Sequence, residues 1–167
     1  MFFTVSSRAF RCVHAPEFTN ALFSEKCQPF QLAFLKMLSD YAPKTWKEIR
    51  KISKHGHYLE DYEKKRIGQY LGLTSKEMQS LVNNYTVCQI AIDEKENYRI
   101  FGILEDFANT HLFKILLFDP NHLFYYNPNK SQYPWGSEAI CLFSKENCSL
   151  VNCQPSLPKP TKKPRRK

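Results

Sequence analysis

The sequence predicts an α+β protein, with N-terminal helices packed on one face of a small antiparallel β-meander and a disordered basic C-terminal tail. The first half of the chain carries apolar residues at helical spacing, most clearly over residues 30–41. The second half, from residue 86 onward, has short runs rich in Ile, Leu and Phe that are separated by turn residues. Because the helices come before the strands and do not alternate with them, this order favours α+β.

Chain length and composition predict a single folded domain. The 167 residues are 43% hydrophobic and 14% aromatic. That is enough for a core, since a chain of about 150 residues buries roughly 70% of its unfolded surface. The composition changes at residue 154, after which Pro, Lys and Arg dominate. We therefore expect one α+β domain over residues 1–153 and a disordered tail over residues 154–167.

The first third of the chain predicts a strand and two helices. Residues 2–5 read Phe-Phe-Thr-Val and fit a short strand. Phe18, Leu22 and Phe23 follow a proline at helical spacing and predict a short helix. Residues 30–41 lie between two prolines and repeat apolar side chains at i, i+3, i+4 and i+7. They predict a helix that faces the core.

Two capping boxes predict further helix starts, because each has a threonine followed three positions later by a glutamate. One box precedes residues 46–53 and the other precedes the apolar residues of 78–82. Between them, residues 60–70 are charged with apolar points at helical spacing, and a glycine at position 72 ends that helix. The two boxes are Thr45 with Glu48 and Thr74 with Glu77.

The strand-forming region begins after these helices. Its apolar runs are rich in Ile, Leu and Phe, and Asp119-Pro120-Asn121-His122 between two of them fits a tight turn. We expect the chain to leave this turn in a further strand, and a short edge strand to follow a loop. The predicted strands are residues 86–92, 98–104, 112–118, 122–126 and 139–143.

The charge of the chain points to an anionic partner, with RNA or the ribosome first. Net charge is +8 and the pI is about 9.2. Basic residues gather around His55-Gly56-His57 and in the tail, where they could contact phosphates. An inert basic loop and a solubilising tail are the alternatives. The candidate nucleic-acid-binding residues are Lys47, Arg50, Lys51, Lys54, Lys162, Lys163, Arg165 and Arg166.

Several classes of function lack their sequence signals. Neither GxGxxG nor GxxxxGK[ST] occurs, and the six cysteines include no CxxC pair, so we expect no cofactor and no metal site. A bridge among Cys141, Cys148 and Cys153 is an alternative to reduced thiols. No secretory signal and no apolar run of about 18 residues is present, so we expect a cytoplasmic protein without a membrane partner.

Arg99, His122 and Tyr126 are the candidate catalytic residues. Alternate residues of a strand share one face, so a strand at residues 122–126 would put His122 and Tyr126 together and Tyr125 opposite. The permanent charge of Arg99 needs water or an anion, and a phosphodiester would satisfy it. Near neutral pH, His122 could shuttle a proton to or from a ribose 2′-hydroxyl. The alternative is an edge-strand arginine paired with Glu94, Glu96 or Glu105.

Three segments resemble the RelE/ParE toxin superfamily, and more narrowly the ribosome-dependent mRNA endonucleases of the RelE and YoeB type. They are Tyr98-Arg99-Ile100-Phe101, His122-Leu123-Phe124-Tyr125-Tyr126 and the opening Phe3-Thr4-Val5-Ser6-Ser7-Arg8-Ala9. The resemblance implies a toxin endoribonuclease in which Arg99 stabilises the phosphate in the transition state. It also implies His122 as general acid or base and Tyr125 or Tyr126 as a residue that orients or stacks on the substrate. Glu94 or Glu96 would serve as a base, and an antitoxin would be a partner.

Two other functions use different features. Residues 66–81 resemble a helix-turn-helix in which Lys76 and Gln79 could face a DNA groove. With the basic tail, they favour a non-catalytic nucleic-acid-binding or accessory protein. An aromatic-rich face that docks on another protein would instead make the chain an inhibitor.

Overall fold

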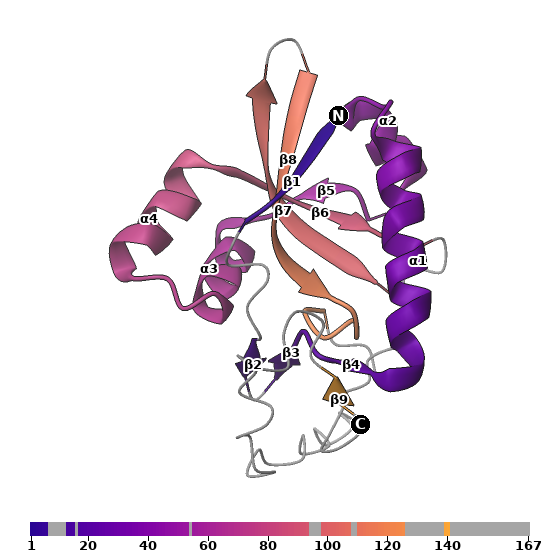
Figure 1. Cartoon of the computed structure of the whole chain (residues 1–167). Coiled ribbons are helices and arrows are strands. Elements are labelled where there is room, and N and C mark those ends of the chain that lie inside the picture. Colours follow the sequence, from indigo (N-terminus) through magenta and orange to yellow (C-terminus); the bar gives the residue numbers. More distant parts are fainter. Residues whose placement is uncertain are drawn as a thin grey trace, which may run out of the picture.

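The computed structural model describes residues 1–6, 13–15, 17–53, 55–93, 98–107, 110–125 and 139–140. The predicted tail, the three C-terminal cysteines and the basic residues Lys54, Lys162, Lys163, Arg165 and Arg166 lie outside these ranges (Figure 1). The strands are β1 (Phe2–Val5), β2 (His14–Ala15), β3 (Phe18–Thr19), β4 (Leu22–Phe23), β5 (His57–Tyr58), β6 (Thr86–Ala91), β7 (Arg99–Phe107), β8 (Thr110–Asp119) and β9 (Ala139–Ile140). The helices are α1 (Ser24–Tyr41), α2 (Trp46–Ile52), α3 (Asp61–Tyr70) and α4 (Ser75–Asn84).

A mixed five-stranded sheet organises the fold, and its strand order is β1-β8-β7-β6-β5. Neighbouring strands from β5 to β8 run antiparallel, whereas β1 lies parallel to β8 at one edge. The α+β class predicted from the sequence is therefore confirmed. The strand predicted at residues 2–5 also forms, but it joins the sheet beside a strand more than a hundred residues away.

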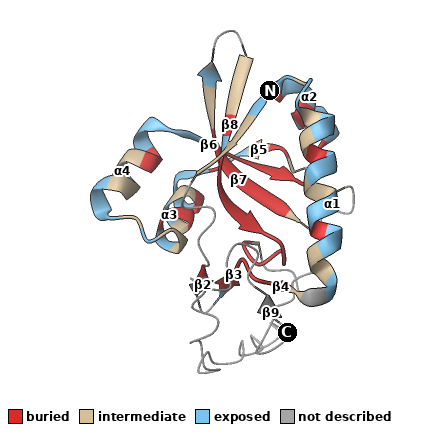
Figure 2. Cartoon of the chain, viewed as in Figure 1, coloured by how far each residue is buried: buried red, intermediate tan, exposed pale blue. Residues whose placement is uncertain are grey.

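Helices cover both faces of this sheet, not one face as we expected. In one core, Phe30 and Met37 of α1 lie with Ile100 of β7. In the other, Ile67 of α3 lies with Phe101, the next residue of β7. Figure 1 shows α1 on one side of the strands and α3 with α4 on the other, and Figure 2 shows the buried strands between them. A strand made of consecutive apolar residues has both of its faces buried. A strand with one face in solvent would alternate apolar and polar residues.

Tertiary packing overrides helical spacing in residues 18–23. Phe18 belongs to β3, and Leu22 and Phe23 form β4, so the predicted short helix is wrong. The Phe18 ring stacks on Tyr70 of α3 with centroids 4.5 Å apart, and Phe18 is completely buried in the core that contains Ile67. The helix predicted at residues 30–41 begins earlier, at Ser24, and includes Pro29.

Both capping boxes form as predicted. The Thr45 N–H donates to Glu48 Oε2 at 2.7 Å, and Thr45 Oγ1 accepts from the Glu48 N–H at 3.4 Å. Thr74 and Glu77 repeat this geometry before α4, with distances of 2.8 and 3.4 Å. Each box satisfies amide groups that have no partner within the first turn of a helix. These local signals therefore set the starts of α2 and α4.

The chain leaves β8 in a compact turn, so the strand predicted at residues 122–126 is wrong. The N–H groups of Leu123 and Phe124 donate to the Asp119 carboxylate at 2.8 and 2.9 Å. His122 has a φ of 56°, in the left-handed region. The Asp119 side chain thus takes the place of a neighbouring strand, and the alternation of faces that we expected for His122 and Tyr125 does not apply.

Candidate functional site

Arg99 lies at the start of β7 and is 3% exposed. Its register partners are Ala91 on β6 and Asp119 on β8. The guanidinium carbon lies 5.3 Å from the centre of the Tyr125 ring, and a guanidinium nitrogen lies 3.5 Å from His55 Nε2. The protein itself therefore surrounds the charge of Arg99 with a carboxylate, an aromatic ring and a histidine.

His122 lies in the turn after β8, is 5% exposed and is close enough to Arg99 to feel its charge. Its Nδ1 donates to the carbonyl oxygen of Tyr125 at 2.9 Å, which leaves Nε2 as the acceptor nitrogen of a neutral ring. Burial, and then the charge of Arg99, lower the pKa of His122. Burial is also the main cause that lowers the pKa of His57. Both imidazoles are thus held in the neutral form near pH 7.

Glu63 of α3 holds Tyr125 in place. Its Oε1 accepts a hydrogen bond from the Tyr125 hydroxyl, and its Oε2 accepts one from the Glu60 N–H at 2.8 Å. Burial, together with the neighbouring Glu63 carboxylate, raises the pKa of Tyr125, so the phenol keeps its proton. The His57 and Tyr125 rings lie 6.4 Å apart. A helix, a turn and a β-strand therefore meet at this tyrosine.

Gln89 of β6 completes what we call the buried polar cluster. Its side chain is fully buried, and neither its Oε1 nor its Nε2 has a hydrogen-bond partner among the described residues. Gln89 lies opposite His57 on β5 and Phe101 on β7. The buried polar cluster consists of the buried residues Glu63, Gln89, Arg99, Asp119 and His122 together with the half-buried residues His55, His57 and Tyr125.

The structure brings two of the three predicted catalytic residues together. Arg99 and His122 belong to one cluster, whereas Tyr126 lies outside the described residues and its neighbour Tyr125 occupies the site. Glu94 and Glu96 also lie outside them. Glu105 lies six residues along β7 from Arg99, or about 20 Å at roughly 3.3 Å per residue, so it does not pair with that arginine.

A second feature, the α2–β5 groove, has a volume of about 570 Å³ and lies at the surface. Basic residues Lys47, Arg50 and Lys51 are exposed, and none of the described residues that line the groove is acidic. The Arg50 guanidinium lies 5.0 Å from the centre of the Tyr58 ring. The residues that line the groove are Trp46, Lys47, Arg50, Lys51, Gly56, His57 and Tyr58.

A tight connection between α2 and β5 builds this groove. The Ser53 N–H donates to the Ile49 carbonyl at 2.8 Å, and the Gly56 N–H then donates to the Ser53 carbonyl at 2.9 Å. A Cβ at Gly56 would lie 3.1 Å from Arg50 Cα, so a glycine lets the returning chain pass close to the helix. The groove and the buried polar cluster share this segment, since His55 contacts Arg99 and His57 lines the groove.

Comparison with known proteins places the chain in a family. A family model described as "Uncharacterised protein UU032" matches residues 9–147. The chain belongs to this family. No curated protein and no solved structure matches the chain. The resemblance to the RelE and ParE toxins therefore stays a prediction.

The segment that resembles a helix-turn-helix folds as the hairpin of α3 and α4. Gly72 ends the first helix with a φ of 62°, and Gly68 lets Met78 approach closely, since a Cβ there would lie 2.4 Å from its sulfur. Lys76 and Gln79 of α4 are exposed. The hairpin packs its apolar side against the sheet, while these two side chains remain at the surface.

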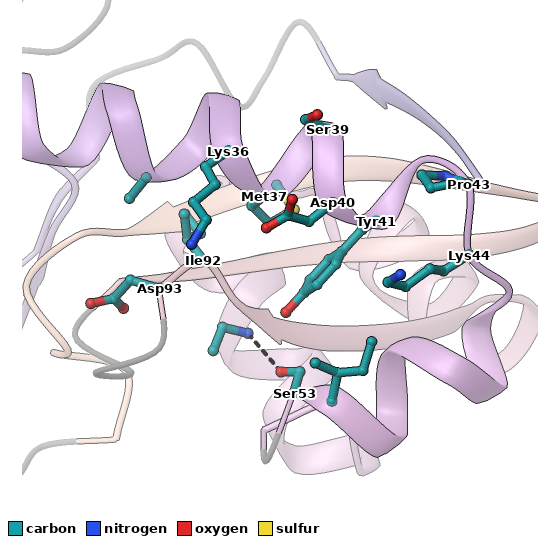
Figure 3. A pocket seen from close by; sticks show the side chains of 13 residues that line it. Lys36, Met37, Ser39, Asp40, Tyr41, Pro43, Lys44, Ser53, Ile92 and Asp93 are labelled. Atoms are coloured by element: carbon teal, nitrogen blue, oxygen red, sulfur yellow. Dashed lines mark hydrogen bonds between the residues drawn. The ribbon is translucent and has the colours of Figure 1, made fainter.

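A third hollow, with a volume of about 910 Å³, lies between α1, α2 and the end of β6. Figure 3 shows Tyr41 pointing across it toward Ser53, whose Oγ accepts a hydrogen bond from the Ala91 N–H at 3.3 Å. Its lining mixes charges of both signs, with two lysines, Lys36 and Lys44, and two aspartates. Because the lining carries charges of both signs, it favours neither an anionic nor a cationic ligand.

The described part of the chain has few side chains placed to bind a metal ion or to act as reactive thiols. There, no group of three or more His, Cys, Asp or Glu side chains is arranged to hold a metal ion. Cys27 and Cys88 are free thiols, and burial raises the pKa of Cys88 to about 12, so it stays protonated. The helices of the described residues include none that is long and apolar enough to span a bilayer.

Sequence reasoning missed several residues of both features. Glu63 looked like one of many charged positions on α3, and Gln89 looked like an interruption in a strand. Trp46 and Tyr58 are separated by the loop that the sequence marked as basic. The strand pattern could have identified Gln89, because a glutamine inside a run of apolar residues lies on a buried face of the strand.

Proposed function

We propose that this protein binds nucleic acid, RNA first, along the α2–β5 groove. The observation that carries the proposal is the lining of that groove. Exposed Lys47, Arg50 and Lys51 line the groove together with the exposed ring of Tyr58, and no described lining residue is acidic. A surface of this composition attracts phosphates and offers ring faces to bases.

The basic side chains have complementary roles in this proposal. Lys47 and Lys51 are exposed and lie one helical turn apart on α2, so both ammonium groups can contact a phosphate backbone. Arg50 lies over Tyr58, which holds its planar guanidinium in a fixed orientation. A net charge of +8 adds long-range attraction for an anionic partner.

The buried polar cluster has a supporting role in this proposal. Arg99, His122 and Glu63 are each less than 7% exposed, which leaves little surface for a large substrate to contact. His55 lies against Arg99 and Gly56 follows it directly, so the cluster supports the loop that forms one wall of the groove. Arg99 therefore affects the groove indirectly, because its contact with His55 helps to position the loop that lines the groove.

Equilibrium binding tests the proposal with charge-matched variants. We expect Lys47→Gln combined with Lys51→Gln to weaken binding of a fluorescent single-stranded RNA 12-mer by about tenfold or more at 50 mM salt. The control combines Lys65→Gln and Lys114→Gln, which removes the same charge from exposed positions on α3 and β8. Equal losses in the two pairs would show a general charge effect and overturn the proposal.

A second candidate is the RelE-type ribonuclease that the sequence resemblance implies. The observation that favours it is the convergence of Arg99, His122 and Tyr125 in one cluster, where His122 Nδ1 donates to the Tyr125 carbonyl oxygen. In this candidate, a histidine takes the proton of a ribose 2′-hydroxyl. The 2′-oxygen then attacks the adjacent phosphorus, the bond from phosphorus to the 5′-oxygen breaks, and the 5′-oxygen takes up a proton from water. A cyclic phosphate and a 5′-hydroxyl would be the products.

Expression in a bacterial host tests this second candidate. A ribosome-directed ribonuclease should arrest growth, and His122→Asn should relieve the arrest while circular dichroism shows a folded protein. Asn is chosen because it accepts the left-handed backbone of position 122. Unimpaired growth on expression of the wild-type chain would count against the ribonuclease and, with it, against an antitoxin partner.

A further inference from the structure

We propose that the α2–β5 groove selects single-stranded nucleic acid by stacking a base on Tyr58. This inference rests on the proposed nucleic-acid binding and adds the substrate class to it. It depends on the position of one exposed aromatic ring among basic side chains, and on the groove in which that ring lies.

Tyr58 is exposed but held in place. The residue is 47% exposed, although it belongs to a strand that pairs with β6. Its ring lies 5.8 Å from the buried Trp46 ring at an interplanar angle of 51°. The Arg50 guanidinium lies over one face of the ring, 5.0 Å from its centre, so it restricts the rotation of the ring and the base would stack on the opposite face. A ring fixed in this way loses little conformational entropy when a base stacks on it.

The place of Tyr58 in the fold favours a single strand. β5 is the edge strand of the five-stranded sheet, and its two residues form a short wall beside α2. In a duplex the bases are stacked on one another and paired, so their faces cannot reach an aromatic side chain. Single-stranded nucleic acid exposes those faces, and proteins that bind it combine a basic groove with aromatic stacking. The groove has both parts.

The size of the groove limits the number of phosphate contacts. α2 has seven residues, which span about 10 Å at 1.5 Å per residue. Three exposed basic side chains along that length can contact about two or three phosphates. For a single strand, each phosphate contact contributes about −0.7 to the slope of log affinity against log salt concentration. Three contacts therefore predict a slope of about −2. A short oligonucleotide is therefore long enough to test the site.

Anisotropy measurements with matched nucleic acids test the inference. The probes are a labelled RNA 12-mer and the same strand annealed to its complement, each titrated with the full-length chain. We expect the single strand to bind about tenfold more tightly than the duplex. Tyr58→Leu should reduce single-strand affinity about tenfold and leave duplex affinity unchanged. Tyr62→Leu, at an exposed tyrosine of α3, is the control and should change neither.

The outcomes separate this inference from the proposed function. If neither probe binds, the proposed nucleic-acid binding fails and this inference fails with it. If both probes bind equally and Tyr58→Leu changes nothing, the proposed function stands and the stacking role is wrong. Tyr58→Phe keeps the ring and should keep the affinity, so a loss in this variant would also overturn stacking. The strand preference of the wild type provides the test if Tyr58→Leu does not fold.

Discussion

At the scale of single residues, the main finding is a group of polar side chains that the fold buries together. The sequence singled out Arg99 and His122 from a turn and two apolar runs, and the structure places both in one cluster. It did not predict Glu63, which accepts a hydrogen bond from Tyr125, because α3 precedes β7 by about 30 residues in the sequence. Tyr126 was chosen on strand parity, which fails because Asp119 folds the chain into a turn.

Gln89 gives the first prediction at this scale. A buried amide without hydrogen bonds costs about 1–3 kcal/mol, and its partners are absent among the described residues. We expect Gln89→Met, which has a similar volume, to raise the free energy of unfolding by about 1 kcal/mol in urea denaturation. A loss of stability would show that the Gln89 amide does form hydrogen bonds in solution.

His122 gives a prediction about pH. Its pKa is lowered from the ordinary histidine value of 6.5, mainly by burial, so as the pH falls the unfolded chain binds a proton before the folded chain does. The resulting stability is present above pH 6.5 and is lost as the pH falls through the folded pKa. Stability should therefore decrease less between pH 7.5 and 5.5 in His122→Asn than in wild type, by urea denaturation. If the variant and the wild type lose the same free energy of unfolding between the two pH values, the lowered pKa of His122 is contradicted.

At the scale of elements, the sequence predicted correctly those helix starts and turns that are set by hydrogen bonds between residues close together in the chain. The starts of α2 and α4 follow from Thr45 and Thr74, whose side chains accept hydrogen bonds from the backbone three residues on. The turn at Asp119 was also predicted, because an aspartate satisfies nearby amides. Residues 18–23 were predicted wrongly, since the spacing that resembled a helix arises from Phe18 packing against α3.

The two capping boxes give a paired prediction. Thr45→Ala and Thr74→Ala each remove one cap and should each lower the free energy of unfolding by about 1 kcal/mol. Since α2 carries the groove, Thr45→Ala should also weaken RNA binding, whereas Thr74→Ala should not. Thermal unfolding and anisotropy measure the two effects. Equal binding by both variants would mean that the order of α2 does not matter to the groove.

At the scale of the whole molecule, long-range pairing determines what the sequence could not predict. The parallel pairing of β1 with β8 and the two helix layers depend on contacts between distant segments. The same pairing joins features that seemed separate in the sequence. The His55–His57 loop lies beside Arg99 because β5 pairs with β6 and β6 with β7. The groove therefore rests on the buried polar cluster.

The salt dependence of RNA binding tests the proposed function most directly. Affinity for a single-stranded RNA 12-mer is measured between 50 and 200 mM salt, for wild type and for Lys47→Gln with Lys51→Gln. Because each phosphate contact contributes about 0.7 to the slope of log affinity against log salt, removal of two lysines should make the slope shallower by about 1.4. The same slope in both proteins, or no binding by the wild type, would contradict nucleic-acid binding at the α2–β5 groove.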